Sequence, residues 1–311
     1  MSSRTRFRTP AVVLTALVTL IIGVLGIAPA QAAVNTNPNA QTWKVLVGNQ
    51  TPDMAIQGMR FLPGEIWIHQ TDSINFVSNS AEIHTVSYGT PPLPPTSIAN
   101  LEADAFTPVG GPVFDPTAPW TNSGILAPPV PHAPFIQSYQ LKFAAPGDFT
   151  FYCLIHGEMM NIVVHVMNKQ ATLPHKQAYY DWQASVQSGQ IIADGLALEA
   201  KTLAKSSPTH IFVGAMDDQA MVMRFMPSPD AVRKGTTVTF DMSANQGVVP
   251  HTVTFTDLKQ GGKLVDSGVL LPAFAGGPST FNVTFDQTGI FHYLCEFHDD
   301  MGMVGQVIVT P

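Results

Sequence analysis

The chain has 311 residues and a formal net charge of −7, and charged residues make up only 12% of it. An acidic chain without a block of Lys or Arg residues lacks the electrostatic footprint of a nucleic-acid binder, so we expect no nucleic-acid partner. The 26 prolines and 24 glycines, combined with so few charges, favour a turn-rich β protein over a helical one.

The N-terminus has the layout of a secretory signal peptide. Three arginines precede an apolar run over 11–27, and Ala-Gln-Ala at 30–32 offers a small-x-small cleavage site. The alternative is a retained anchor, but the run is shorter than the roughly 20 residues that span a bilayer. We therefore predict that residues 1–32 are removed and that the mature chain has no transmembrane segment. It should be secreted or periplasmic, outside the cytoplasm.

The remaining chain contains a repeat. Its two cysteine segments align at a constant offset of 142 residues, from Cys153 to Cys295. Each copy reads as a period-2 strand, a glycine turn, and a second period-2 strand that ends at the cysteine. The matching residues are Leu141, Phe143, Gly147, Phe149, Phe151, Cys153 and His156 in the first copy, and Val283, Phe285, Gly289, Phe291, Tyr293, Cys295 and His298 in the second.

The front halves of the two copies match as well. "MRFLP" over 59–63 corresponds to "MRFMP" over 223–227. Each is followed by a strand-like stretch and then by a histidine with Thr-Val after it, at His84 and His251. Each repeat therefore carries an early histidine, a Cys-x-x-His motif and methionines close behind.

These matches predict an all-β fold of two tandem antiparallel sandwich domains, over 40–168 and 207–311. The first domain carries a Pro/Gly-rich insertion over 85–122, which reads as an ordered excursion or a mobile loop. Residues 169–206 form the linker, which we expect to form one or two helices over 175–204 and to pack between the domains. Its apolar stripe at helical spacing consists of Tyr179, Trp182, Val186, Ala193, Leu196, Ala200 and Leu203.

The duplicated Cys, His, His and Met set indicates a metal site. A disulfide between the repeats would explain the two cysteines but not the matched histidines and methionines. Zinc would prefer a closed tetrahedron, usually with more than one thiolate. One thiolate, two imidazoles and a weak thioether are the ligand set of a blue-copper electron-transfer site. We therefore expect copper as the cofactor, as two type 1 ions per chain.

The chain resembles a two-domain cupredoxin of the plastocyanin and amicyanin type. "GIFHYLCEFHDDMGMVGQVIV" is similar to the copper loop of plastocyanins, and "GDFTFYCLIHGEMMNIVVHV" to the shorter loop of amicyanins. The resemblance implies Greek-key sandwiches and selects Met303 and Met159 as axial ligands, with Met301 and Met160 as the fallback residues. The implied ligand sets are His84, Cys153, His156 and Met159, and His251, Cys295, His298 and Met303.

The same resemblance implies two further features of the sites. His156 and His298 should lie nearest the surface as the electron ports. The family commonly has Asn after the first histidine, whereas this chain has Thr85 and Thr252. A hydroxyl there can still hydrogen-bond to the cysteine loop, so we expect tuning of the site rather than its loss.

The function that follows is electron transfer between redox partner proteins outside the cytoplasmic membrane. Two alternatives remain open, a copper-dependent oxidase or reductase with an extra catalytic copper, and a copper-binding or storage module. No two histidines stand two residues apart and neither cysteine is preceded by histidine, so the bridges used by copper oxidases are missing from the sequence. An electron carrier is therefore favoured over an enzyme. We expect surface or structural roles for His69, His132, His165, His175, His210 and His292.

Overall fold

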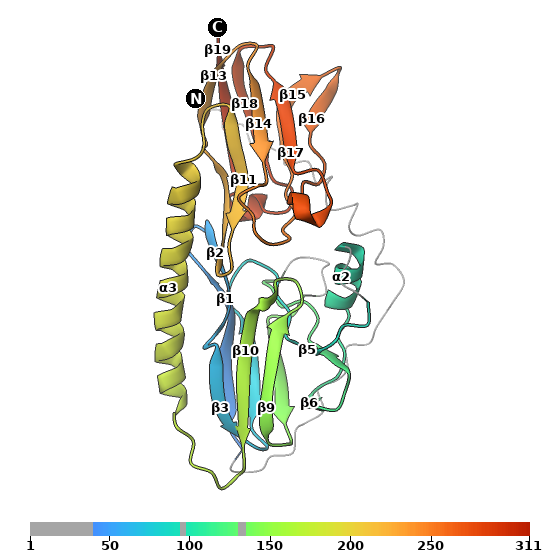
Figure 1. The fold of residues 1–311 in the computed structure, drawn as a ribbon, viewed down its shortest axis with the longest axis vertical. Helices are drawn as coiled ribbons and strands as arrows, with labels where there is room; N and C mark the ends of the chain where they lie inside the picture. The colour runs from blue at the N-terminus through green and yellow to red at the C-terminus, as the bar shows by residue number, and fades with distance from the viewer. Residues whose placement is uncertain (1–39, 94–97, 130–134) are drawn as a thin grey trace, which may run out of the picture. The chain divides into compact units, whose positions relative to one another are not determined.

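Strands make up most of the chain, as Figure 1 shows for the computed structural model, which describes residues 40–93, 98–129 and 135–311. The predicted signal peptide lies outside these described residues. Within them, no helix combines the length and the apolar character needed to cross a membrane. The strands fall into two groups separated by one long helix, which confirms the predicted fold class.

We refer to β1–β10 as the first domain. Its strands are β1 (Thr42–Gln50), β2 (Ile56–Leu62), β3 (Glu65–His69), β4 (Ser73–Ser78), β5 (Ser87–Gly89), β6 (Val113–Phe114), β7 (Trp120–Asn122), β8 (Ser138–Phe143), β9 (Gly147–Cys153) and β10 (Gly157–Met167), and its helix is α2 (Ile98–Ala105). Side chains alternate between the core and the surface along several of them, as the period-2 pattern predicts, whereas β2 and β7 are buried almost throughout. In β1, for example, Trp43, Val45 and Val47 are buried.

We refer to β11–β19 as the second domain. Its strands are β11 (His210–Met216), β12 (Ala220–Met226), β13 (Asp230–Arg233), β14 (Thr237–Asp241), β15 (Thr254–Gln260), β16 (Lys263–Asp266), β17 (Thr280–Thr284), β18 (Gly289–Leu294) and β19 (Val304–Thr310). Two short 3₁₀ turns, η1 (Ala273–Ala275) and η2 (Asp299–Met301), lie in its loops. A core of buried aliphatic and aromatic side chains fills this sandwich and includes Cys295.

The two domains share one sheet, which the sequence did not predict. The strand order is β17-β14-β11-β12-β2-β1-β4-β8-β6, so β12 of the second domain pairs with β2 of the first. The pairing is antiparallel, with Ala220 opposite Gly58 and Val222 opposite Ile56. Each domain closes its sandwich with a five-stranded sheet of its own, β3-β10-β9-β5-β7 and β13-β19-β18-β15-β16. The domains are therefore joined by main-chain pairing as well as by the linker.

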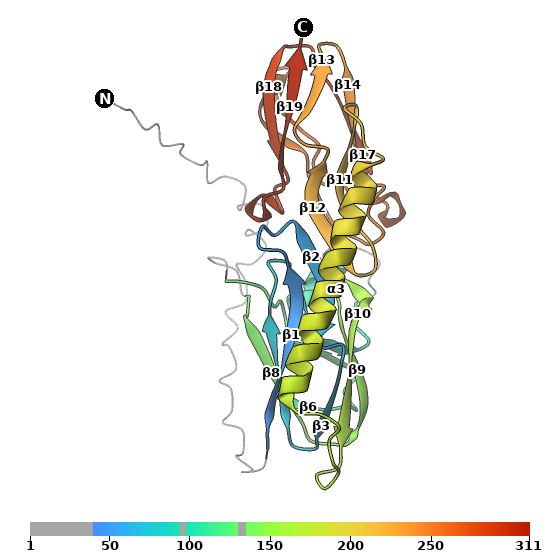
Figure 2. The same cartoon turned by 90° about the vertical axis from the view of Figure 1, so that its left-hand side faces the viewer.

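The linker forms a single helix, α3 (Gln177–Leu203), where the sequence left one or two helices open, and the buried face differs from the predicted one. The buried residues are Tyr180, Ala184, Ile191, Gly195 and Thr202, whereas the larger side chains of the predicted stripe are exposed. The reason is close packing against the shared sheet. A Cβ on Gly195 would lie 2.3 Å from the side chain of Ile56, so glycine lets the helix approach β2. Figure 2 shows α3 crossing in front of that sheet.

The insertion of the first domain holds regular elements in its described part. It contains α2 and the strands β5, β6 and β7. Ala105 and Trp120 from the insertion form a small core with Leu154, the residue after Cys153. The insertion thus packs against the loop that carries Cys153 and His156, which favours the ordered excursion over a mobile loop.

Candidate metal centres

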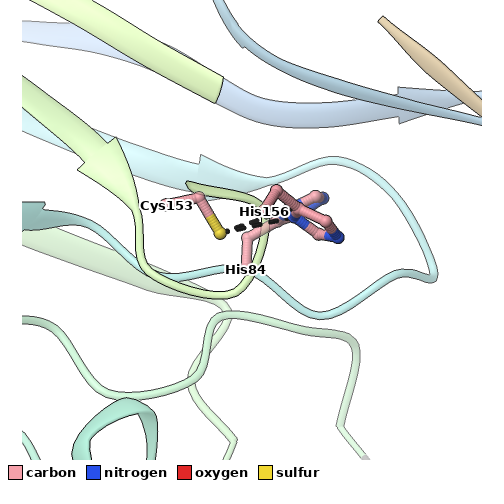
Figure 3. Close-up of side chains that lie close together, drawn as sticks. All are labelled: His84, Cys153 and His156. Carbon is pink, nitrogen blue, oxygen red and sulfur yellow. Dashed lines mark hydrogen bonds between the residues drawn. The ribbon is translucent and has the colours of Figure 1, made fainter. Parts of the chain in front are cut away.

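The first cluster brings together His84, Cys153 and His156, as Figure 3 shows. Alternation along β9 turns Phe149, Phe151 and Cys153 inward, so the cysteine ends the strand inside the core. His156 follows in the turn before β10, and an isolated bridge to Leu126 holds His84. The Sγ of Cys153 lies 3.4 Å from Nδ1 of His156 and 4.0 Å from Nδ1 of His84. The two Nδ1 atoms are 3.2 Å apart.

The second cluster repeats this arrangement with His251, Cys295 and His298. The Sγ of Cys295 lies 3.6 Å from Nδ1 of His251 and 3.5 Å from Nδ1 of His298. The two Nδ1 atoms are 3.1 Å apart. Since a first-row metal ion sits about 2.0–2.3 Å from such nitrogen and sulfur ligands, one ion placed among the three atoms fits this spacing. Both clusters have the donor set and size of a mononuclear site.

The histidines are neutral at pH 7. Burial lowers the pKa of His156 and His298 to about 4. Burial also lowers the pKa of His84 and His251 well below the ordinary value, and the neighbouring imidazole adds to the effect. Each ring can therefore present the Nδ1 lone pair to a cation. Two lone pairs directed at one point repel each other until a cation lies between them, so these clusters fit a bound metal.

A nearby positive charge is also needed to stabilise either cysteine as a thiolate. Burial raises the pKa of Cys153 and Cys295, although each Sγ accepts a main-chain hydrogen bond that works the other way. The donors are the N–H groups of Thr85 and Thr252, each 3.4 Å from the sulfur. The neighbouring histidines are neutral, so the positive charge that stabilises a buried thiolate comes from a metal ion. The soft thiolate favours copper over zinc.

The threonine that follows each early histidine takes part in the site. The Oγ1 of Thr85 accepts a hydrogen bond of 2.8 Å from the N–H of Leu154. The Oγ1 of Thr252 accepts one of the same length from the N–H of Glu296. These bonds link the strand of the early histidine to the residue directly after the cysteine, so the predicted hydroxyl contact to the cysteine loop is confirmed.

Two glycines that sequence reasoning missed lie against the early histidines. Gly48 and Gly214 have φ of +75° and +68° and sit at the bulges of β1 and β11. A Cβ would come within 2.5 Å of Nε2 of His84 at the first and within 2.7 Å of Nε2 of His251 at the second. Glycine therefore allows the bulge to press on the ring and hold its Nδ1 toward the sulfur. The signal in the sequence was a Val-Gly pair at the same place in both copies.

Two arginines from the repeated "MRF" segments hold the copper loops. Arg224 donates from Nη1 to the carbonyl oxygen of Met301 at 2.7 Å. Arg60 donates from Nη1 to the carbonyl oxygen of Met159. Each arginine thus fixes the main chain next to the expected methionine ligand. The repeat itself was visible in the sequence, but its role in the site was not.

The methionines of the two copper loops differ in position. Met303 is buried with no exposed surface, beside Cys295 in the core of the second domain. In the first domain Met159 is 38% exposed, whereas Met160 is fully buried in the same core cluster as Cys153. The sequence prediction took Met159 as the ligand with Met160 as the fallback, and this placement departs from it by favouring the fallback residue.

Strand pairing gives the reason for the departure. In the second domain Leu294 lies opposite Val304, the residue after Met303. The matching residue of the first domain, Tyr152, lies opposite Asn161, the residue after Met160. An irregularity between Gly157 and Asn161 shifts the register of β10, so that β10 advances four residues where β9 advances one. Met160 therefore takes the place of Met303.

Neither expected electron port is open to solvent. His156 and His298 are each 6% exposed, only slightly more than the early histidines. The first domain covers His298, since Oε2 of the buried Glu82 lies 3.9 Å from its Nε2. Burial raises the pKa of Glu82 to about 7. Met301, on the second copper loop, belongs to a core cluster formed mainly by the first domain. Within each pair, His156 and His298 are still the more exposed histidine, as predicted.

The remaining described histidines stand apart from both clusters. Each has a structural contact: His69 with the carbonyl oxygen of Ala171, His165 with Asp148 and Glu65, His175 with the ring of Tyr179, His210 with Asp241, and His292 with Asp257. His132 lies outside the described residues. Among the residues that the structure describes, the two clusters are the only groups of this kind that could hold a metal ion.

Comparison with known proteins agrees with this geometry. Residues 212–310 match a family described as copper binding proteins of the plastocyanin/azurin family. The chloroplast plastocyanin of Tetradesmus obliquus is 30% identical over 152 residues, which are 46% of this chain and 97% of that protein. Plastocyanin of Daucus carota is 32% identical over 100 residues, 30% of this chain and 93% of that protein. Among solved structures, a purple cupredoxin from Nitrosopumilus maritimus is 23% identical, with a TM-score of 0.24, and covers 33% of this chain and 99% of its own.

Proposed function

The chain belongs to the plastocyanin/azurin family of copper-binding proteins, and from this premise we propose how its residues serve electron transfer. It is a plastocyanin-like electron carrier with one type 1 copper site in each domain. One observation carries this function: in both domains a buried thiol and two neutral imidazoles direct Sγ and two Nδ1 atoms at one point.

In the first site the ligands are His84, Cys153, His156 and Met160. The other three donors already lie close together, and Met160 is supported over Met159 by its burial in the core cluster that includes Cys153 and by the register of β10. A thioether in this place would supply the weak fourth donor of a blue-copper site. This set keeps three of the four residues expected from the sequence and replaces the fourth.

In the second site the ligands are His251, Cys295, His298 and Met303. The burial of Met303 beside Cys295 supports it over Met301, whose carbonyl oxygen is bound by Arg224. The copper loop of this domain has one residue more between the second histidine and the methionine than that of the first. The two sites therefore differ in loop length but share one donor set.

Copper supplies a one-electron couple at each site. The protein keeps the ligands in place, so that little rearrangement accompanies the change of charge. The threonine hydroxyls tie the cysteine loop to the strand of the early histidine, the two glycines let the bulges press on the rings, and the arginines hold the loop carbonyl groups. Donors held in this way suit rapid outer-sphere transfer.

The partners of an electron carrier are other redox proteins. We place this exchange outside the cytoplasmic membrane, because the N-terminal residues have the pattern of a secretory signal peptide. On the second copper loop Asp299 and Asp300 are exposed. Carboxylates there favour a partner with a basic surface, since complementary charge raises the rate of encounter.

An absorption spectrum with copper quantitation tests this function. We expect about two copper ions per chain and an intense visible thiolate-to-Cu(II) band, in keeping with two type 1 sites. More than two coppers together with turnover of oxygen or nitrite would instead indicate a copper oxidase or reductase. Tight Cu(I) binding with no visible band after oxidation would indicate a storage module. Either of these results would overturn the proposal.

A further inference from the structure

The outer face of α3 carries an apolar stripe that the two domains do not use. Tyr179, Trp182, Val186, Leu196 and Leu203 are exposed along it, with Trp182 at 60% and Leu196 at 50%. The opposite face of the helix is the one that packs on the shared sheet. In Figure 2 the outer face of α3 points away from that sheet, and no other described element lies over it.

The spacing of this stripe is that of a helix–helix seam. From Tyr179 to Leu203 its positions are separated alternately by three and four residues, and the intervening members are Gly189, Ala193 and Ala200. This 3-4 alternation is the heptad pattern by which one helix packs along another. From Tyr179 to Leu203 the stripe is about 36 Å long, and a helix with its side chains is about 10 Å across. The footprint of at most about 360 Å² is that of the largest apolar patch on a typical monomer, which is often functional.

The order of large and small side chains shows what kind of helix fits. When a second α3 is laid antiparallel with its centre at Ile191, the largest side chain of the stripe, Trp182, meets the small Ala200. The facing pairs are Trp182 with Ala200, Val186 with Leu196, and Gly189 with Ala193. A parallel pairing would place Trp182 on Trp182 and Gly189 on Gly189, which crowds one layer and empties another.

The flanks of the seam are compatible with the same pairing. In the antiparallel arrangement each flank of the seam faces the same flank of the second helix. Gln190 therefore lies opposite Gln190 of the second copy, Ile192 lies opposite Ile192, and Ser185 lies opposite Glu199. No pair of like charges is brought together along the seam. A residue-by-residue match of a surface to itself is the property of an isologous two-fold interface.

We propose that α3 docks antiparallel against α3 of a second copy of this chain and forms a two-fold dimer. The seam is smaller than the ~1,200–2,000 Å² of a standard protein interface, so the dimer should dissociate on dilution. Near the two-fold axis the seam passes beside the first copper loop, because Gln190 lines one pocket together with Met159. None of the seam residues is a copper ligand.

Sedimentation velocity over a range of concentrations tests the dimer. The copper-loaded chain should sediment as a dimer at high concentration and as a monomer when diluted. Leu196→Glu should weaken the dimer at least about tenfold, because a carboxylate would be buried in the seam. Leu264→Glu is the matched control, since Leu264 is 49% exposed on β16, and it should leave the dimer unchanged. Both variants should keep the visible copper band, which reports that they are folded.

Cross-linking tests the orientation. Gln183 and Ala197 face each other across the antiparallel seam, whereas each lies about 21 Å along the axis from its own copy. A mixture of Gln183→Cys and Ala197→Cys chains should form a disulfide-linked dimer under mild oxidation, and neither variant alone should do so. A monomer at all concentrations, cross-linking of each variant to itself, or loss of the dimer in Leu264→Glu would overturn the proposal. Binding of the wild-type chain to phosphatidylcholine vesicles through this stripe would also overturn it.

Discussion

Cys295→Ser is expected to lower the bound copper from about two ions per chain to one and to remove the second domain's share of the visible band. The serine hydroxyl cannot replace the thiolate that forms the strong bond to copper. Loss of this direct ligand should weaken copper binding at that site by more than the ~10–100-fold that follows loss of an outer hydrogen-bonding partner. The band that remains then belongs to the first site.

Cys153→Ser provides the matched experiment on the first domain. It should leave the second site intact and remove the complementary part of the spectrum, so that the two single variants add up to the wild type. The double variant should bind no copper tightly and show no visible band. An unchanged spectrum in either single variant, or complete loss of copper in one of them, would contradict two independent sites.

Met160→Gln is expected to change the spectrum and the reduction potential of the first site, because it replaces the axial thioether by an amide oxygen. Met159→Gln, one residue away, should change neither, since its side chain is at the surface. Cys295→Ser is a useful background for both variants, because only the first site then contributes to the signal.

The same pair of residues can be compared without copper. In the metal-free chain Met160→Ala should lower the free energy of unfolding by about 2–5 kcal/mol, as for other methionines removed from a core. Met159→Ala should stay within about 0.5 kcal/mol of the parent. Chemical denaturation measures both values. If Met159→Gln changed the spectrum and Met160→Gln did not, the register of β10 would be wrong.

The donors of both sites could be predicted because the chain carries the motif twice. Matching the two copies isolated His84 and His251 from the other histidines, and placed each with a Cys-x-x-His motif far along the chain. Alternation along β9 and β18 then determines that the cysteine points inward. Such patterns are local and periodic, so they can be recognised in the sequence.

The sequence named both Met159 and Met160 as candidates for the fourth ligand of the first site, but their order could not be predicted in the same way. Met159 and Met160 are adjacent, and the choice between them depends on a bulge in β10. Adjacent residues of a strand point to opposite faces, and nothing in "HGEMMN" marks where the register changes. Comparing the length of this loop with that of the second copy did not decide between Met159 and Met160.

The contacts between the domains were also beyond the sequence. The apolar stripe of α3 could be recognised in the sequence. The helix nevertheless buries its other face, where Ala184 and Gly195 allow close approach to the shared sheet. The pairing of β12 with β2 and the position of Glu82 beside His298 depend on how two folded domains meet. Neither leaves a periodic signal in the chain.

Diffraction from crystals of the copper-loaded chain at the copper absorption edge tests the central claim most directly. The anomalous difference map should show two peaks per chain, one among Sγ of Cys153 and Nδ1 of His84 and His156, the other among the matching atoms of the second domain. A single peak, or a strong peak at one of the remaining histidines, would contradict an electron carrier with two type 1 copper sites.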